Sequence, residues 1–276
     1  SDTIRGAHRS RPRRFRRIGS PVIIKLIKKR DSHELTLAEI IEKKNTLVPS
    51  AVKILDVLDL GLCPYGEAWE IQKKLHAERL ASQIPDTLIL VEHPNVYTLG
   101  KNADARHLLA SQEYLKKRGI EVYQIDRGGD ITYHGPGQLV GYPIFNLKEH
   151  KTSIAWYVNS VEEVLIETLA KFDIRAERIK GLTGIWLANQ KIAAIGMRVS
   201  HWVTMHGFAL NVTTDLSLFG GIVPCGLATK GVTRMCDLNS AVTMDTVKAV
   251  VIKEFVAQFG FRESRMKMNF ETNKPL

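Results

Sequence analysis

The chain lacks long apolar runs and has few cysteines. No uninterrupted run of 18 apolar residues occurs among its 276 residues, whereas a helix needs about 20 to cross a bilayer. We therefore expect no membrane-spanning helix, and no apolar signal-peptide core stands near the start. The three cysteines, Cys63, Cys225 and Cys236, share no metal-ligand spacing. This sparse set predicts a reducing compartment, no disulfide framework and no metal site.

Two phosphate-binding motifs are also missing. The sequence contains neither GxxxxGK[ST] nor GxGxxG. The first motif cradles the phosphates of a hydrolysed nucleotide, and the second binds a dinucleotide. The sequence therefore shows no apparatus for nucleotide hydrolysis, and we expect no cofactor.

Positive charge is plentiful but confined to one end. The formal net charge is +10, and residues 1–30 contain 11 of the 39 basic side chains and one of the 29 acidic ones. Residues 31–276 therefore carry 28 of each sign and are neutral. An Arg-rich, acid-poor segment of this kind is typical of a flexible, solvated arm. A phosphate-binding arm, an arm that attracts acidic protein partners and the remnant of an organellar transit peptide are alternatives.

The rest of the sequence predicts one α/β domain. Apolar periodicity predicts helices at 65–82, 111–119, 153–172 and 245–260. Strands are expected at 52–60, 87–93, 96–100, 120–125, 139–145 and 205–213, with two more inside 184–200 joined by a turn near Asn189 and Gln190. Because neighbouring strands have short links, the sheet should be mixed, with antiparallel pairs. We expect a basic, flexible extension at 1–50, a single catalytic domain at 51–264 with a mixed sheet flanked by helices, and a polar tail at 265–276.

One stretch of the sequence is unusually rich in glycine. "RGGDITYHGPGQ", from Arg127 to Gln138, holds four glycines, one proline and a histidine between two expected strands. Glycine lets the backbone take positive φ and approach a ligand closely, and exposed N–H groups bind an oxyanion or a phosphate. An ordinary tight turn is the alternative. Arg127 and His134 favour a site, because placing a charged or ionisable side chain near a buried strand end without a partner costs free energy.

A second segment, "GIVPCGLATKG", holds Cys225 between Pro224 and Gly226. A turn exposes a cysteine more than a strand does, and a thiolate is a good acyl acceptor; a buried, inert cysteine is the alternative. A nucleophilic cysteine needs a base nearby, and His134, His206 and Lys191 are the candidates. Lys191 opens an apolar strand that can desolvate its amine. The other histidines are expected to be surface or structural: His8, His33, His76, His93, His107, His150 and His201.

Four motifs occur in an order that resembles one known family. They are "RGGDITYHGPGQLVGYP", "GIWLANQKIAAIGMRVS", "HGFALNV" and "VPCG", with "EHPNVYTLG" ahead of them. Together they resemble the LipB family, the octanoyl-[acyl carrier protein]:protein N-octanoyltransferases. The resemblance covers about Val52 to Phe261, and the N-terminal fifty residues have no counterpart in the compact family core.

This resemblance implies a fold, a reaction and a set of site residues. The fold is that of the biotin and lipoate-protein ligases. The reaction passes an octanoyl group from octanoyl-acyl carrier protein through an enzyme thioester to a lysine of a lipoyl domain, either in 2-oxoacid dehydrogenase E2 subunits or in the glycine-cleavage H protein. The implied catalytic residues are Cys225 and Lys191. The implied acyl pocket consists of Arg127, Gly128, Gly129, Thr132, Tyr133, His134, Gly135, Ala194, Ile195, Gly196, His206, Gly207 and Ala209. The protein is then expected to be a monomer without metal or membrane contact, in the bacterial cytoplasm or alternatively a mitochondrial or plastid matrix.

Four alternatives to this function are weighed. A lipoate-protein ligase would need ATP and no Cys225, and an octanoyl amidotransferase would take its acyl group from a lipoylated-type carrier protein. A nucleic-acid-binding module could use the Arg-rich arm with a steep salt dependence, but the neutral body disfavours it. A catalytically inactive scaffold is disfavoured by the presence of both Cys225 and Lys191.

Overall fold

The structure is a computed structural model that describes residues 53–223 and 230–267. The predicted basic extension at 1–50, most of the predicted tail and Cys225 lie outside the described residues.

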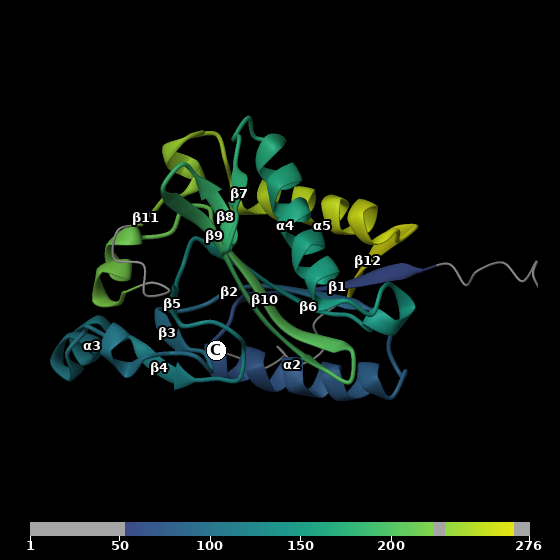
Figure 1. Cartoon of the computed structure of the whole chain (residues 1–276), viewed down its shortest axis with the longest axis horizontal. Helices are drawn as coiled ribbons and strands as arrows, with labels where there is room; N and C mark the ends of the chain where they lie inside the picture. Colours follow the sequence, from purple (N-terminus) through teal and green to yellow (C-terminus); the bar gives the residue numbers. More distant parts are fainter. Residues whose placement is uncertain (1–52, 224–229, 268–276) are drawn as a thin grey trace, which may run out of the picture. The chain divides into compact units, whose positions relative to one another are not determined.

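A large mixed sheet forms the centre of the described domain (Figure 1). Its order is β12-β1-β2-β6-β10-β9-β8-β7, with β11 beside β9. The bounds are β1 Ile54–Leu62, β2 Thr87–Glu92, β6 Gln138–Ile144, β7 Glu177–Ile179, β8 Leu182–Leu187, β9 Gln190–Ser200, β10 Val203–Asn211, β11 Gly231–Val232 and β12 Glu263–Lys267. β1 pairs in parallel with β2 and β12, and β11 pairs in parallel with β9. The pairings from β2 through β6, β10, β9 and β8 to β7 are antiparallel.

A second, three-stranded sheet carries the glycine-rich stretch. Its order is β4-β3-β5, formed by Glu121–Gln124, Val96–Leu99 and Ile131–His134. The helix α3, Gln112–Arg118, leads into β4. Ser111 accepts a hydrogen bond from the N–H of Tyr114 at its start, and Gly119 ends it in the left-handed conformation at φ 60°, as expected for a capped helix.

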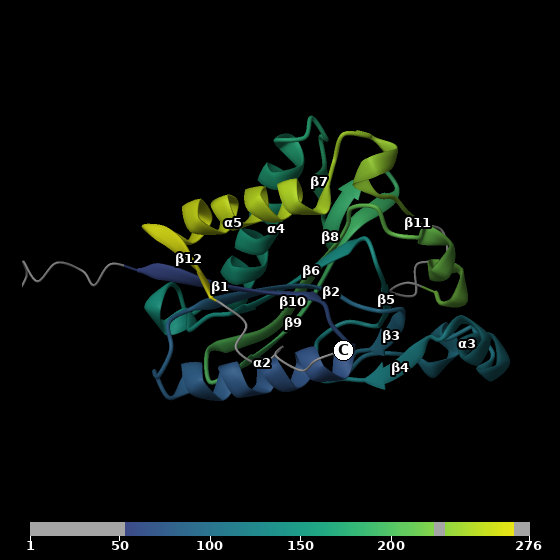
Figure 2. The same ribbon diagram turned by 180° about the vertical axis from the view of Figure 1, so that it is seen from behind.

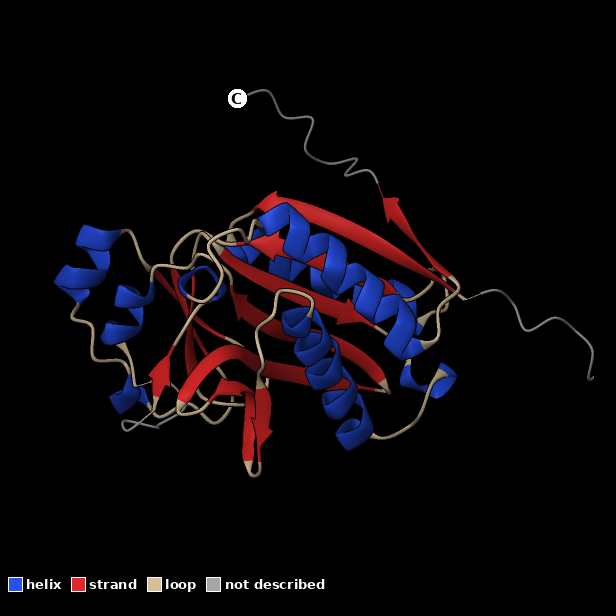
Figure 3. Cartoon of the chain, turned by 90° about the horizontal axis from the view of Figure 1, so that it is seen from above, coloured by secondary structure: helices blue, strands red, loops and turns tan. Residues whose placement is uncertain are grey.

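Helices cover the two faces of the large sheet unequally. α4 (Ile154–Ala170) and α5 (Met244–Phe259) pack together on one face, and α2 (Tyr65–Leu80) packs on the other against β6 and β10 (Figures 1 and 2). Viewed from the α4 and α5 side, both helices lie over the strands (Figure 3). The largest apolar cluster fills the α4 and α5 side, and a smaller one lies beneath α2. None of the helices in the described ranges has both the length and the apolar character needed to span a bilayer.

The predicted mixed sheet with flanking helices is confirmed, but four strands, β5, β7, β11 and β12, were not predicted. β5 lies inside the stretch that we expected to be loop, and it pairs with β3 through Ile131 to His134. β7 and β12 lie at the two edges of the large sheet. Every residue of β12 is exposed, so the strand is held by backbone pairing to β1 and leaves no apolar pattern to detect. It also takes in residues 265–267, which we had assigned to the tail.

Candidate functional site

A cavity of about 570 Å³ lies where the glycine-rich segment meets β9 and β10. This volume is typical of small-molecule sites. Residues of the predicted site that line it are Arg127, Gly128, Gly129, Thr132, His134, Lys191, Ala194, Ile195, Gly196, His206, Gly207 and Ala209. The topology explains the gathering, because β9 and β10 are paired neighbours and the segment before β5 lies against β9 through the Gly128 N–H, 2.9 Å from the carbonyl of Met197.

Tyr133 and Gly135 lie outside this cavity. Side chains alternate along β5, so Thr132 and His134 line the cavity while Tyr133 is fully buried elsewhere, with its ring edge-on to Phe219 at 5.2 Å. The Tyr133 hydroxyl donates to the Asn95 side chain at 2.8 Å. A Cβ on Gly135 would come within 1.8 Å of that hydroxyl oxygen, so this glycine makes room for Tyr133.

Lys191 reaches the cavity from the start of β9. Its ammonium lies 4.7 Å from the centre of the Trp186 ring, a cation–π contact. Its carbonyl accepts a hydrogen bond from the N–H of Thr233 at 3.0 Å, just beyond β11. The segment that carries Cys225 is therefore followed directly, in the described chain, by residues that pair alongside Lys191.

Arg127 is a buried cation at the polar end of the cavity. Its Nη2 donates to the carbonyl of Thr98 at 2.7 Å and to the Thr98 hydroxyl at 2.9 Å. Its Nη1 donates to the carbonyl of Gly128 at 3.0 Å. These three bonds hold the guanidinium in place at the wall of the cavity.

His134 is held as a neutral imidazole. The Gln138 amide N–H donates to Asn211 at 2.9 Å and to the carbonyl of Tyr133, so its oxygen must accept from His134 Nδ1 at 2.7 Å. Nε2 therefore keeps its lone pair and faces the Thr98 hydroxyl at 3.4 Å. Burial lowers the pKa of His134 to about 3, which agrees with a neutral ring in this tautomer.

His206 occupies a strained position on β10. It is buried and has φ 57°, a conformation that non-glycine residues rarely adopt. Its Nε2 lies 2.8 Å from Asp126, whose carboxylate also pairs with Arg198 at 2.5 Å. Burial lowers the pKa of His206 to about 4, against the raising effect of Asp126. Partial burial acts to raise the pKa of Asp126, but His206 and Arg198 hold it below its ordinary value.

Glycines at two positions are required by the contact between the glycine-rich segment and β9. Gly129 has φ 88°, in the left-handed region. A Cβ on Gly196 would lie 3.0 Å from the carbonyl oxygen of Gly128 and 3.1 Å from Cδ of Arg127. The turn at Gly137, in contrast, does not offer a free N–H for an oxyanion, because its N–H donates to Glu92 at 2.8 Å.

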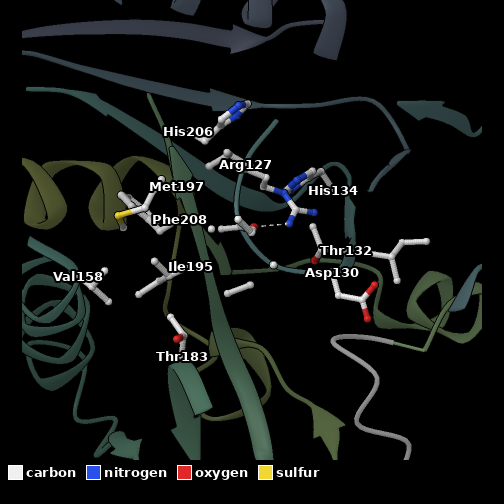
Figure 4. Close-up of a pocket in the computed structure, with 18 of the residues that line it drawn as sticks. Arg127, Asp130, Thr132, His134, Val158, Thr183, Ile195, Met197, His206 and Phe208 are labelled. Carbon is white, nitrogen blue, oxygen red and sulfur yellow. Dashed lines mark hydrogen bonds between the residues drawn. The ribbon is translucent and has the colours of Figure 1, made fainter. Parts of the chain in front are cut away.

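The cavity has a polar end and an apolar end (Figure 4). Arg127, His134 and His206 gather at the polar end. Val158, Ile195, Met197 and Phe208 line the other side. A cavity with an apolar side of this kind suits an extended apolar chain.

Sequence reasoning missed several contributors. Tyr65, Asp130, Tyr142, Val158 and Thr183 also line the cavity. Val158 lies on α4, whose apolar periodicity indicated only a core-facing helix, and Thr183 lies on β8. For Asp130, a signal was present, since it follows directly on the paired glycines Gly128 and Gly129.

Known proteins resemble this chain in sequence and in fold. Residues 64–256 match the family model described as the lipoyl protein ligase A/B catalytic domain. An octanoyltransferase of Gloeobacter violaceus is 50% identical over 205 residues, which cover 74% of this chain and 90% of that protein. An octanoyltransferase of Rubrobacter xylanophilus is 50% identical over 212 residues, covering 76% and 93% respectively.

Solved structures of lipoate-protein ligases share the fold. A bi-partite lipoate protein ligase from the lipoylation system of Thermoplasma acidophilum has a TM-score of 0.62 at 19% identity, over 78% of this chain and 88% of that chain. Lipoate-protein ligase A bound with ATP has a TM-score of 0.61 at 18% identity, over 79% and 90%. The predicted lipoate-protein-ligase-like fold is thus confirmed.

Proposed function

The chain belongs to the octanoyltransferases of the lipoyl protein ligase A/B catalytic domain family and is an acyltransferase, and we propose that it moves an octanoyl group from octanoyl-acyl carrier protein to a lysine of a lipoyl domain. The group rests on Cys225 as a thioester between the two steps. Lipoyl domains of 2-oxoacid dehydrogenase E2 subunits and the glycine-cleavage H protein are the acceptors. The single observation that carries this proposal is the cavity with Lys191 and Arg127 on its wall and an apolar far side.

The first step exchanges one thioester for another. Lys191 takes the proton of the Cys225 thiol, and the thiolate attacks the octanoyl carbonyl. The tetrahedral intermediate collapses with loss of the carrier protein's thiolate, which takes the proton from Lys191. The exchange is nearly isoenergetic, so it requires no ATP.

The second step forms the amide. The lysine amine of the lipoyl domain attacks the octanoyl-Cys225 carbonyl, the C–N bond forms, and the C–S bond breaks. Lys191 serves again as base and returns a proton to the departing Cys225 sulfur. Positioned bases of this kind contribute roughly 10²–10⁴ to a rate.

The apolar side of the cavity supports an eight-carbon chain as the transferred group. Val158 comes from α4 and Phe208 from β10, so two layers of the fold together bound this side. Burying each methylene of an acyl chain there contributes about 0.8 kcal/mol. Lys191, at the start of β9, marks the part of the cavity where the octanoyl carbonyl is bound for attack.

The test is acyl transfer to an isolated lipoyl domain, followed by intact mass. Octanoyl-acyl carrier protein without ATP should add about 126 Da, one octanoyl group, to the lipoyl domain. Free octanoate without ATP should add nothing. The matched control is a lipoyl domain with its acceptor lysine replaced by arginine, which keeps the charge and cannot form the amide. Transfer from free octanoate that depends on ATP, with none from the carrier protein, would contradict the proposal and indicate a ligase.

A further inference from the structure

A carboxylate–imidazole pair lies at the cavity wall, apart from the residues used above. Asp130 lines the cavity. Its Oδ2 lies 2.5 Å from Nδ1 of His107, and its Oδ1 accepts from the N–H of Asp104 at 3.3 Å. His107 belongs to η2, the short 3-10 turn Ala105–His107. No sequence motif singled out this histidine.

The pair fixes the orientation of the imidazole. A carboxylate accepts hydrogen bonds, so Nδ1 of His107 carries a proton toward Asp130. Nε2 is then the ring atom with a lone pair, and no described residue hydrogen-bonds it. The His107 side chain is 28% exposed and that of Asp130 is 13% exposed. The imidazole therefore bridges between a mostly buried cavity wall and solvent.

The backbone anchors His107 independently of its ring. The carbonyl of His107 accepts from the N–H of Val223 at 2.8 Å, and Leu108 pairs with Ile222. The N–H groups of Leu109 and Ala110 both donate to the carbonyl of Gly221. Replacing the imidazole should leave this backbone pairing in place. Val223 also stands two residues before Cys225 in the sequence.

The proposed reaction has a proton balance that differs between its two steps. Thioester exchange consumes one thiol and releases another, so it releases no net proton. Amide formation begins from a lysine ammonium, because free lysine has a pKa of about 10.4. Two protons leave that nitrogen, and only one is taken by the Cys225 sulfur. The second step therefore releases one proton to solvent, and a base in contact with solvent, in addition to Lys191, would speed this release.

We propose that His107, oriented by Asp130, accepts the proton released during amide formation and passes it to solvent. This inference rests on the proposed function. An N–H bond of the acceptor lysine breaks, the proton reaches His107 Nε2 through water, and the imidazolium then returns it to bulk water. Asp130 stabilises the imidazolium, as the orienting carboxylate does for a histidine base. Asp104, which forms an ion pair with the exposed Arg106 on the same turn, also interacts electrostatically with His107.

The variant that isolates the ring nitrogen is His107→Asn. An asparagine amide can donate to Asp130 as Nδ1 does, but it has no base in the place of Nε2. Arg106→Gln, a change to an exposed neighbour on the same turn, is the matched control. Each protein is first charged with octanoyl-acyl carrier protein, and the rate of thioester formation is measured by quenched intact mass. The octanoyl-enzyme is then mixed with lipoyl domain, and amide formation is timed from about pH 5 to pH 8, where histidines commonly titrate.

His107→Asn should form the thioester at the wild-type rate and form the amide about 10²-fold more slowly. The bend that an imidazole gives to the pH profile of amide formation should disappear. Adding imidazole to His107→Ala should restore part of the rate, which a purely structural role would not allow. Arg106→Gln should match wild type in both steps.

The inference is overturned if His107→Asn slows both steps equally, or if it slows neither. Should His107→Asn fail to fold, the comparison of His107→Ala with and without imidazole decides alone, and the absence of rescue contradicts the role. If wild type itself forms no thioester, the proposed function fails instead, so the two failures are distinguishable.

Discussion

The two faces of the large sheet differ in what they bury. On the α4 and α5 side, Phe145, Phe255 and Phe259 stack edge-on and face-on within one large apolar cluster. On the α2 side and in the small sheet beside it, the structure buries His93, His134, His206 and Arg127. The cavity opens between these environments and takes residues from both.

Several buried polar groups on the α2 side of the sheet also have no hydrogen-bond partner. Among the described residues, Trp69, Gln72 and His76 on α2 have buried polar atoms without a partner, as does Nδ1 of His206, and on the other face Tyr157 and Thr168 of α4 each have one. Buried polar groups are usually paired, and the unpaired ones are more numerous on the α2 side. The difference predicts that stability depends mainly on one face and activity on the other.

Lys191→Met should have the largest effect, a loss of turnover without a loss of stability. Methionine keeps an unbranched stem beside Trp186 but has no proton to exchange. Turnover should fall by about 10²–10⁴ if Lys191 is the base, while the thermal unfolding midpoint should stay near that of wild type. Steady-state transfer to a lipoyl domain and a thermal melt measure the two quantities. A normal turnover would remove Lys191 from the mechanism.

Phe259→Ala should destabilise the apolar cluster on the α4 and α5 side of the sheet. Phe259 is buried at the end of α5, packs against Phe145 at 5.1 Å between ring centres and does not line the cavity. Truncating a buried phenylalanine destabilises a protein by about 3–5 kcal/mol. Urea unfolding should show this loss, and kcat at low temperature should be unchanged. A fall in kcat without a loss of stability would reverse the assignment of the two faces.

The buried histidines give the polar half a pH-dependent stability. His93 donates from Nδ1 to the carbonyl of Cys63 at 2.7 Å and accepts from the Tyr142 hydroxyl at 2.8 Å. Burial lowers the pKa of His93 to about 4 from an ordinary value of 6.5. The unfolded chain therefore binds the proton first as pH falls, so stability is complete above pH 6.5 and is lost as pH falls toward 4.

The variant His93→Gln tests whether protonation of His93 lowers the stability of the native state at acid pH. Between pH 7 and pH 5, a single histidine with these properties costs the native state about 2 kcal/mol. The variant should be less stable than wild type at pH 7 but should lose about 2 kcal/mol less on acidification. Urea unfolding at both pH values gives the comparison. An equal loss in both proteins would show that His93 is protonated in the native state.

Val158→Phe should have the smallest effect and should change selectivity rather than rate. Val158 bounds the apolar side of the cavity from α4. A larger side chain there shortens the space for the acyl chain, and each methylene left unburied costs about 0.8 kcal/mol, roughly fourfold. The ratio of kcat/KM for octanoyl over hexanoyl carrier protein should therefore fall several-fold. An unchanged ratio would place the end of the acyl chain elsewhere.

Periodicity and caps predicted most of the fold. α4 and α5 have strong apolar patterns, and the residues that end α3 and α5, Gly119 and Gly260, are the left-handed glycines expected there. The small sheet was harder to predict, because β5 spans only Ile131 to His134 between glycines. The edge strand β12 is held by its backbone and by ion pairs such as Lys267 to Asp56, at 2.9 Å, which no hydropathy pattern reveals.

The candidate site could be predicted only where a motif marked it. The glycine-rich stretch and the β9 motif brought most lining residues to attention, but motif membership does not tell which way a side chain faces. Tyr133 was expected in the wall and lies outside it because strand alternation turns it away. Asp126 and His107 act across the chain, on His206 and Asp130 respectively, and such pairings exist only after folding.

The central claim is that the acyl group rests on Cys225 beside Lys191 before it reaches its acceptor. The most direct measurement is intact mass of the enzyme after mixing with octanoyl-acyl carrier protein in the absence of ATP and of any lipoyl domain. The account predicts a gain of about 126 Da that hydroxylamine removes and that Cys225→Ser lacks. Wild-type enzyme that stays unmodified with a competent donor, or an adduct of equal size in Cys225→Ser, would contradict it.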